Sequence, residues 1–231
     1  MLSEQQSVNK KEIIYPESDG LPMAENTEQF KWIVTIKENL ELLFADRADV
    51  FVAGDLLWYP VEGNNKIRQA PDTMVVFGRP KGRRGSYQQW REDNIAPQVV
   101  FEILSPGNSL LEMIKKLRFY ECYGVEEYYI YEPDKVELTV FLREGERLET
   151  VEEIANWVSP RLGIRFDTSG EELEIYRPDG EKFLTFVELG LARERERQRA
   201  EEAEALLQQE RSRREALEAR LREMGINPEQ I

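Results

Sequence analysis

Two carboxylates lie in apolar, strand-like segments of this chain, and a lysine follows them in the next predicted helix. The residues are Asp72 in the segment Pro71–Val76, Glu102 in the segment Val99–Leu104, and Lys116. An isolated charge is too costly to bury, so each acid must be paired, hydrogen-bonded or bound to a metal. Two acids that share a metal ion, with a lysine facing them, can cleave a phosphodiester bond.

The absence of histidine narrows the chemistry that the chain can perform. With no histidine among its 231 residues, it can form no Ser-His-Asp triad, no Cys-His pair and no histidine-bound zinc site. Any metal must therefore be held by oxygen atoms, which favours Mg²⁺ or Mn²⁺ over Zn²⁺. We expect one of these two ions as the cofactor.

The charge is unevenly distributed along the chain. The formal net charge of −14 argues against strong non-specific binding to nucleic acid. Nine arginines and nine glutamates balance one another between Arg193 and Glu223, so the excess of acid lies in the part before this segment. A nuclease in that part needs a local basic patch to hold its substrate.

Composition also indicates the compartment. The chain has no run of about 18 apolar residues, so we expect no membrane span. Its first residues, Met1–Gln5, lack the basic and apolar segments of a secretory signal. Cys122 is the only cysteine, which excludes an intrachain disulfide and fits a reducing cytosol. We expect a cytoplasmic protein.

The elements that must position the three residues are predicted from apolar periodicity. A helix is expected over 26–46, strands over 50–59 and 69–77, a central strand over 99–104, and a second helix from a capping box at Ser109 to about Gly124. Further strands are expected over 127–132, 136–142 and 173–176. The apolar face of the first helix is predicted to consist of Phe30, Ile33, Ile36, Leu40 and Leu43.

This arrangement allows the three side chains to meet. Lys116 lies at the edge of the apolar face of the second helix and can fold over the strand toward Glu102, whereas Lys115 points away. Asp72 is level with Glu102 if the two strands are neighbours in the right register. The alternatives are that Glu112 pairs with Lys116 on the surface and that Glu102 is a structural acid that accepts backbone hydrogen bonds.

The last part of the chain is predicted to be one long charged helix, from about Phe186 to Met224. One heptad stripe is interrupted by Glu210 and Arg214, and its apolar members are Ala203, Leu207, Leu217, Leu221 and Met224. Two interpretations stay open. The helix is either a solvated single helix with charge pairs or a short coiled coil that joins two copies into a homodimer.

The segments around the three residues resemble the putative restriction endonuclease family, a branch of the PD-(D/E)xK phosphodiesterase superfamily. The resemblance covers roughly residues 20 to 180 and is specific as a set. The matching segments, in order, are Ala70–Val76, Pro97–Pro106, Lys116–Tyr120 and Gly124–Pro133. It implies an α/β, restriction endonuclease-like fold with a central mixed β-sheet flanked by helices.

The resemblance also implies roles for individual residues. Asp72 and Glu102 would be metal ligands together with the backbone carbonyl of Ile103, and Asp72, Glu102 and Lys116 would be the catalytic residues. The motif's lysine normally lies two residues after the acid, where this chain has Leu104. The branch that it resembles uses a lysine on the next helix instead, which here is Lys116.

Composition and the resemblance together predict a flexible lead-in over 1–22, a PD-(D/E)xK nuclease-like domain over 23–185 and a long charged helix, a possible coiled coil, over 186–231. A loop within the domain is rich in basic and aromatic residues and is predicted to bind nucleic acid, or else to be a mobile solvated loop. These residues are Arg79, Lys81, Arg83, Arg84, Tyr87, Trp90 and Arg91. The first helix is expected to supply one more acid, from among Glu28, Glu38 and Glu41.

We therefore expect a metal-dependent DNA endonuclease that hydrolyses phosphodiester bonds, with DNA as its partner. Two alternatives stay open. One is a catalytically inactive nuclease fold that recruits a partner protein through the charged helix. The other is a metal-dependent phosphodiesterase that acts on RNA.

Overall fold

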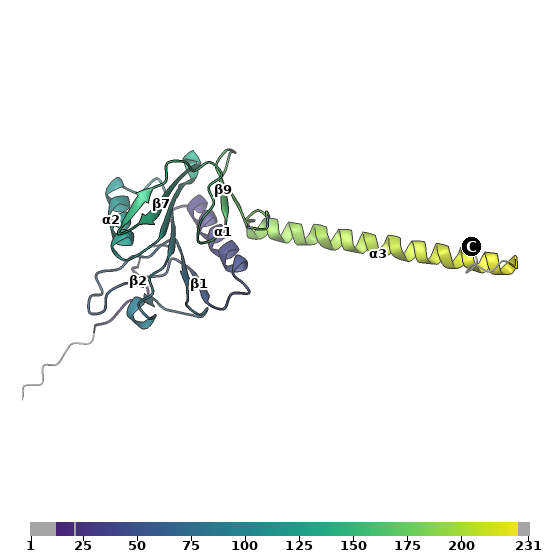
Figure 1. Ribbon diagram of the computed structural model, residues 1–231, viewed down its shortest axis with the longest axis horizontal. Coiled ribbons are helices and arrows are strands. Elements are labelled where there is room, and N and C mark those ends of the chain that lie inside the picture. Colours follow the sequence, from purple (N-terminus) through teal and green to yellow (C-terminus); the bar gives the residue numbers. More distant parts are fainter. Residues whose placement is uncertain (1–12, 21, 226–231) are drawn as a thin grey trace, which may run out of the picture. The chain divides into compact units, whose positions relative to one another are not determined.

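A computed structural model of the chain describes residues 13–20 and 22–225. It divides into two units, Met1–Phe183 and Leu184–Ile231. The first unit contains the predicted strands and all of the predicted site residues. The second unit consists of one long helix and its flanking residues. Figure 1 shows both units, coloured along the sequence.

A six-stranded sheet forms the centre of the first unit. Its spatial order is β1-β3-β5-β6-β7-β8. Strands β5 and β6 are parallel and all other neighbouring pairs are antiparallel, so the sheet is mixed. The strands, in the same order, are Val50–Gly54, Thr73–Phe77, Val99–Ile103, Glu127–Glu132, Glu137–Glu144 and Arg147–Thr150.

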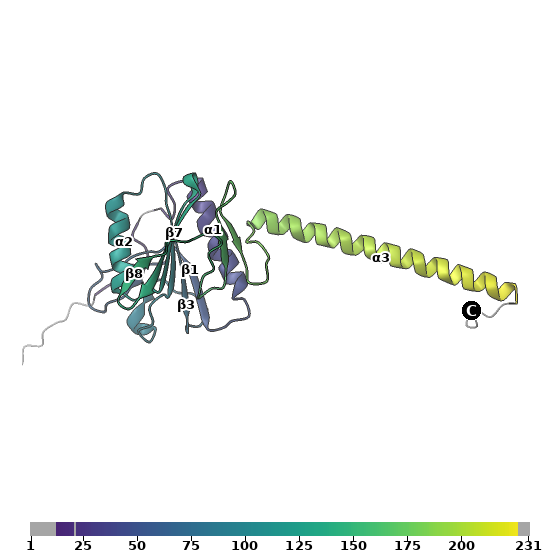
Figure 2. The same cartoon turned by 45° about the horizontal axis from the view of Figure 1, so that its top comes forward.

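Two helices cover the two faces of this sheet. Helix α1 spans Thr27–Leu43 and is capped by Asn26, and helix α2 spans Leu110–Cys122 and begins with the predicted capping box of Ser109 and Glu112. Apolar residues of α1 join one core cluster, whereas Tyr120 of α2 joins the other. Figure 2 shows the helices on opposite sides of the sheet.

This arrangement confirms the predicted fold class. It has a central mixed sheet with flanking helices, followed by a long charged C-terminal helix. The central strand β5 is buried along its whole length, because both of its neighbours and both helical layers cover it.

The prediction of one continuous strand over 50–59 is wrong. Strand β1 ends at Gly54, and a separate strand β2 covers only Trp58–Tyr59. The chain breaks at Asp55, whose φ of 47° lies in the left-handed region that non-glycine residues rarely adopt. The N–H of Asp55 donates to the carbonyl of Pro71, 3.1 Å away, so the break lies directly beside Asp72.

The remaining short elements extend the domain at its edges. Strand β2 pairs with β4, Tyr87–Gln88, and β9, Arg165–Asp167, pairs with β10, Glu174–Tyr176. Two 3-10 helices, η1 and η2, span Gln89–Arg91 and Pro133–Lys135.

Part of the predicted lead-in contacts the domain. The carbonyl of Ile14 accepts from Asn65, the hydroxyl of Tyr15 accepts from the N–H of Gly63, and the carbonyl of Pro16 accepts from the hydroxyl of Tyr59. Residues 1–12 and 21 lie outside the described residues, so the lead-in stays a prediction there.

The long helix α3 spans Phe186–Glu223. It begins with a capping box formed by Thr185 and Glu188 and is followed by Gly225 at a φ of 76°, a usual end for a helix. Ion pairs three or four residues apart line its surface, and none of its residues is buried. Among the described residues, no helix is long and apolar enough to cross a membrane.

Candidate metal centre

The register of the sheet brings the two predicted acids together. Thr73 of β3 lies opposite Phe101 of β5. Because the strands are antiparallel, the same register extended by one residue places Asp72 opposite Glu102. Directly opposite residues project from the same face of a sheet. Here that is the face covered by α2, since Met74 and Val100 on the same face belong to the core cluster of Tyr120.

Glu102 is held by two side chains from α2. Its relative exposure is only 1%. The ammonium group of Lys116 donates to one carboxylate oxygen at 2.6 Å, and the hydroxyl of Tyr120 donates to the other. Lys116 and Tyr120 are one helical turn apart and project from one side of α2. Burial, followed by the charge of Glu102, raises the pKa of Tyr120, so the hydroxyl remains protonated and can donate.

Asp72 lies just before β3, and its carboxylate caps the end of the neighbouring strand. Its Oδ2 accepts from the N–H of Ile103 at 2.6 Å. Burial raises the pKa of Asp72 well above its ordinary value, and the negative charge of Glu102 raises it further. Lys116 and the Ile103 N–H act in the opposite direction but do not cancel these effects. The charged form of Asp72 is therefore unfavourable in this environment, and a nearby cation would stabilise it.

Lys116 remains charged in this environment. Burial lowers the pKa of an ammonium group, but the carboxylates of Glu102 and Asp72 raise it more, so the pKa of Lys116 lies above its ordinary value. Lys116 and Glu102 form an ion pair in which Glu102 is almost fully buried and Lys116 is partly exposed. The side chain of Lys116 thus lines the pocket while its ammonium group contacts the buried Glu102.

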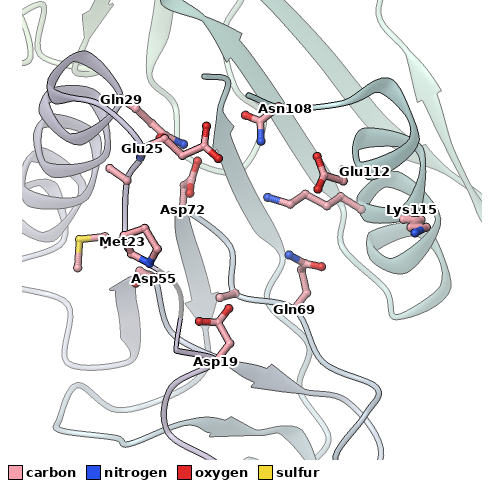
Figure 3. A pocket seen from close by; sticks show the side chains of 14 residues that line it. Asp19, Met23, Glu25, Gln29, Asp55, Gln69, Asp72, Asn108, Glu112 and Lys115 are labelled. Atoms are coloured by element: carbon pink, nitrogen blue, oxygen red, sulfur yellow. Dashed lines mark hydrogen bonds between the residues drawn. The ribbon is translucent and has the colours of Figure 1, made fainter. Parts of the chain in front are cut away.

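The pocket above these residues has a volume of about 320 Å³ and is strongly acidic. Five carboxylates line it, against two lysines. Figure 3 shows Glu112 and Lys115 on α2 at one side of the pocket, and Glu25 and Asp72 at the other. The acids are Asp19, Glu25, Asp55, Asp72 and Glu112, and the lysines are Lys115 and Lys116.

The additional acid comes from a different residue than those expected. Glu28 bonds to Lys31 and Trp32, and Glu38 and Glu41 bond to Lys37, so these three residues bond elsewhere and do not line the pocket. Glu25, which precedes α1, lines the pocket instead, and its carboxylate accepts from the hydroxyl of Ser105. No periodicity marks this residue, because it lies outside the helix.

The predicted nucleic-acid-binding loop does not line this pocket. The described pocket wall includes none of its seven residues. The loop follows the far end of β3 from Asp72, and the ammonium group of Lys81 caps the carbonyls of Phe44 and Ala45 at the end of α1. Arg79 and Arg84 both bond to Glu92.

Within this loop, the aromatic residues differ in how accessible they are. Tyr87 has no exposed surface, its ring packs against Phe51, and its hydroxyl donates to the carbonyl of Ile95. It therefore cannot stack on a base in this conformation, contrary to the expectation for this residue. Trp90 is partly exposed and packs against Tyr15. Arg83 and Arg91 are exposed.

The oxygen atoms of Asp72, Glu102 and Ile103 are of the kind that a hard divalent cation prefers. The described residues contain no group of three or more acidic or cysteine side chains placed to hold a metal. Two carboxylates and one backbone carbonyl nevertheless form a set that Mg²⁺ accepts, because Mg²⁺ takes one or two carboxylates and keeps several waters. Asp72, Glu102 and Ile103 provide these oxygen atoms. A bound cation would stabilise the charged form of Asp72, which burial disfavours.

The chain is an α/β protein with a central mixed sheet flanked by helices. The sequence profile of one family, Uma2, described as "Putative restriction endonuclease", matches residues 19–167. Since this match covers more than half of the chain, the protein belongs to that family, and the predicted resemblance is confirmed.

One solved structure is similar to part of the chain. A crystal structure described as a putative nuclease belonging to DUF820, from Anabaena variabilis, aligns with a TM-score of 0.44 and 15% identity. The alignment covers 58% of this chain and 72% of that chain. No curated protein matches the sequence.

Proposed function

We propose that the protein is a Mg²⁺-dependent endonuclease that hydrolyses phosphodiester bonds in DNA. The observation that carries this proposal is the hydrogen bond between Lys116 and Glu102, with Lys116 and the neighbouring acid Asp72 both lining an open pocket. Three groups come together there, from the residue before β3, from β5 and from α2. Membership of a family of putative restriction endonucleases supports the same chemistry.

The residues that would hold the ion are Asp72, Glu102 and the carbonyl of Ile103. When bound, Mg²⁺ acidifies a coordinated water and neutralises charge on the phosphate. A bound cation is required for a second reason. The five carboxylates that line the pocket repel a negatively charged phosphodiester unless a cation offsets their charge. Mn²⁺ has the same preference for oxygen ligands and is expected to substitute.

Lys116 provides a positive charge that can stabilise the negative charge of the phosphate. Its ammonium group has three donors, of which Glu102 accepts one at 2.6 Å. The others remain for a phosphate oxygen or for the attacking water. A charged donor aimed at the developing charge of a transition state typically contributes about 10²–10³-fold to the rate. Tyr120 keeps Glu102 in place when Lys116 turns toward the substrate.

The substrate backbone would be held away from the cleavage pocket. Arg83 and Arg91 are exposed and are our proposed contacts to phosphates, with the partly exposed Trp90 beside them. The acidic pocket and this basic loop are separate features of the domain, so binding and cleavage are expected to respond to different substitutions.

The test is cleavage by purified protein of plasmid DNA and of an RNA of similar length, with Mg²⁺, with Mn²⁺ and with a chelator. We expect nicking or linearisation of DNA that requires the ion and is retained by Arg118→Met, a control at an exposed basic residue of α2 that does not line the pocket. Cleavage of RNA alone would replace our proposal with the RNA phosphodiesterase. A protein that is inert toward both, yet retains a partner at high salt, would be an interaction protein with an inactive nuclease fold.

We also propose that α3 pairs with α3 of a second copy. Leu207, Leu217 and Met224 are exposed and belong to one stripe of the helix. The polar residues that interrupt this stripe, Glu210 and Arg214, have opposite charges, and Arg214 already bonds to Glu218 on its own helix. A dimer would supply two cleavage sites, as cutting both strands of a duplex requires.

Disrupting this stripe is expected to produce monomers. The double variant Leu207→Glu/Leu217→Glu should weaken the dimer by tenfold or more, because burial of each leucine contributes about 1.5–3 kcal/mol. The measurement is molar mass by light scattering over a range of concentrations. Leu191→Glu, an exposed leucine of α3 outside the stripe, is the control and should remain dimeric. A monomeric parent protein at all concentrations would contradict the proposal.

A further inference from the structure

The pairing of β5 with β3 stops before the end of β5, so Ile103 has a partner in β6 but none in β3. β3 begins at Thr73 and pairs with β5 only from Val99 to Phe101. The N–H of Leu104 faces the other neighbour and donates to Tyr131 on β6. The N–H and the carbonyl of Ile103 therefore face the gap beside β3, where no backbone is available to satisfy them.

Two side chains fill this gap. The carboxylate of Asp72 accepts from the N–H of Ile103, and the side-chain amide of Gln29 on α1 donates to the carbonyl of Ile103 at 2.9 Å. Gln29 is 7% exposed and lines the same pocket as Asp72. Figure 3 shows the side chain of Gln29 directed into that pocket, near Glu25 and Asp72.

Both ends of the Gln29 amide are used. Its oxygen accepts from the N–H of Glu25 at 2.8 Å, while its nitrogen donates to Ile103. An amide is the only side-chain group of this length that offers one acceptor and one donor in this arrangement. A glutamate would place a carboxylate oxygen against the Ile103 carbonyl, and a methionine would provide neither hydrogen bond. These two bonds fix which way the amide faces.

We propose that Gln29 is a positioning residue for the metal centre. It orients the Ile103 carbonyl so that the second lone pair of this oxygen remains available to the cation. Through the N–H of Glu25 it also fixes the acid at the rim of the pocket. This inference rests on the proposed function, because it assigns to Gln29 the task of presenting one of the three oxygen donors.

A purely structural role would have a different signature. Gln29 also joins α1 to the sheet, so its loss is expected to lower stability whether or not a metal binds. A positioning role additionally predicts that metal affinity falls more than the loss of stability explains. Asn39 provides the comparison, since it is a buried amide on the same helix that donates to its own helix at Thr35.

The experiment is a Mn²⁺ titration, in which the paramagnetic signal of free Mn²⁺ reports binding to the full-length protein. Gln29→Met should weaken Mn²⁺ binding about 10–100-fold, as loss of groups that orient metal ligands typically does. Asn39→Leu should remain within about twofold of the parent even if its thermal stability falls as much. Unchanged affinity in Gln29→Met, with a parent that binds Mn²⁺, would overturn the role of Gln29 and leave the proposed function standing. A parent that binds no Mn²⁺ would overturn both.

A second measurement serves if Gln29→Met does not fold. In the parent protein, the side-chain amide resonances of Gln29 should shift during a Mg²⁺ titration in step with the backbone amide of Ile103. The amide of Asn39 should not shift. Movement of the Ile103 signal without that of Gln29 would overturn the inference.

Discussion

Lys116→Met is expected to reduce Mg²⁺-dependent cleavage about 10³-fold and to destabilise the folded protein at the same time. The first effect follows from loss of the only ammonium group that contacts Glu102 among the described residues. The second follows because Glu102, 1% exposed, would lose its cationic partner and keep only the Tyr120 hydroxyl as a side-chain partner. Removing one partner of a buried ion pair costs about 3 kcal/mol or more.

A double variant separates these two effects. Glu102→Gln/Lys116→Met removes both charges of the pair, so most of the lost stability should return. Activity should not return, because the metal ligand is missing as well. The measurements are urea denaturation and single-turnover cleavage of the two single variants, the double variant and the control Arg118→Met. Recovery of cleavage in the double variant, or full activity in Lys116→Met, would remove Lys116 from the catalytic site.

Asp72→Asn is expected to stabilise the folded protein, in contrast to Lys116→Met, but to reduce cleavage by a similar factor. Burial and the neighbouring Glu102 raise the pKa of Asp72, so its charge is unfavourable in the folded state without a cation. The amide oxygen of asparagine can still accept from the N–H of Ile103, since it is nearly the same size as the carboxylate oxygen. We expect a gain of about 1–2 kcal/mol in the free energy of unfolding, typical when a functional site is relieved of strain.

The pH dependence of this gain follows from linkage. The folded protein keeps the proton on Asp72 to a higher pH than the unfolded chain, whose aspartates have a pKa near 3.8. The stability of the parent therefore falls as pH rises from that value through the raised pKa. The advantage of Asp72→Asn should be small in acid and grow toward neutral pH. An advantage that shrinks with rising pH, or a loss of stability at neutral pH in metal-free buffer, would contradict this account of Asp72.

The contact between Lys116 and Glu102 could be predicted from the sequence because simple periodicity determines it. Alternation along a strand places Glu102 on one face, and helical spacing places Lys116, but not Lys115, at the edge of the facing helix. The approach of Asp72 to Glu102 needed only that the two strands be neighbours in antiparallel register, which the structure has. Such inferences succeed where each side chain lies in a regular element or directly beside one, so that the period of the element still applies to it.

The parts of the site that could not be predicted lie where regular structure ends. Glu25 precedes α1, and Asp55 lies at the break between β1 and β2, so no period applies to either. Within α1, the apolar residue Phe30 was expected to face the core, but it is half exposed while the polar Gln29 is buried. The helix is turned so that the amide of Gln29 donates to the carbonyl of Ile103. This carbonyl lacks a partner in β3 only once the sheet has formed, so the sequence alone does not indicate that Gln29 is buried.

The most direct test of the central claim is a crystal structure of the protein with Mn²⁺ at saturating concentration, with the ion located by its anomalous scattering. The account predicts one peak in contact with carboxylate oxygens of both Asp72 and Glu102 and with the carbonyl oxygen of Ile103. An ordered pocket without such a peak, in which Lys116 still contacts Glu102, would contradict the proposal that these residues form a metal centre.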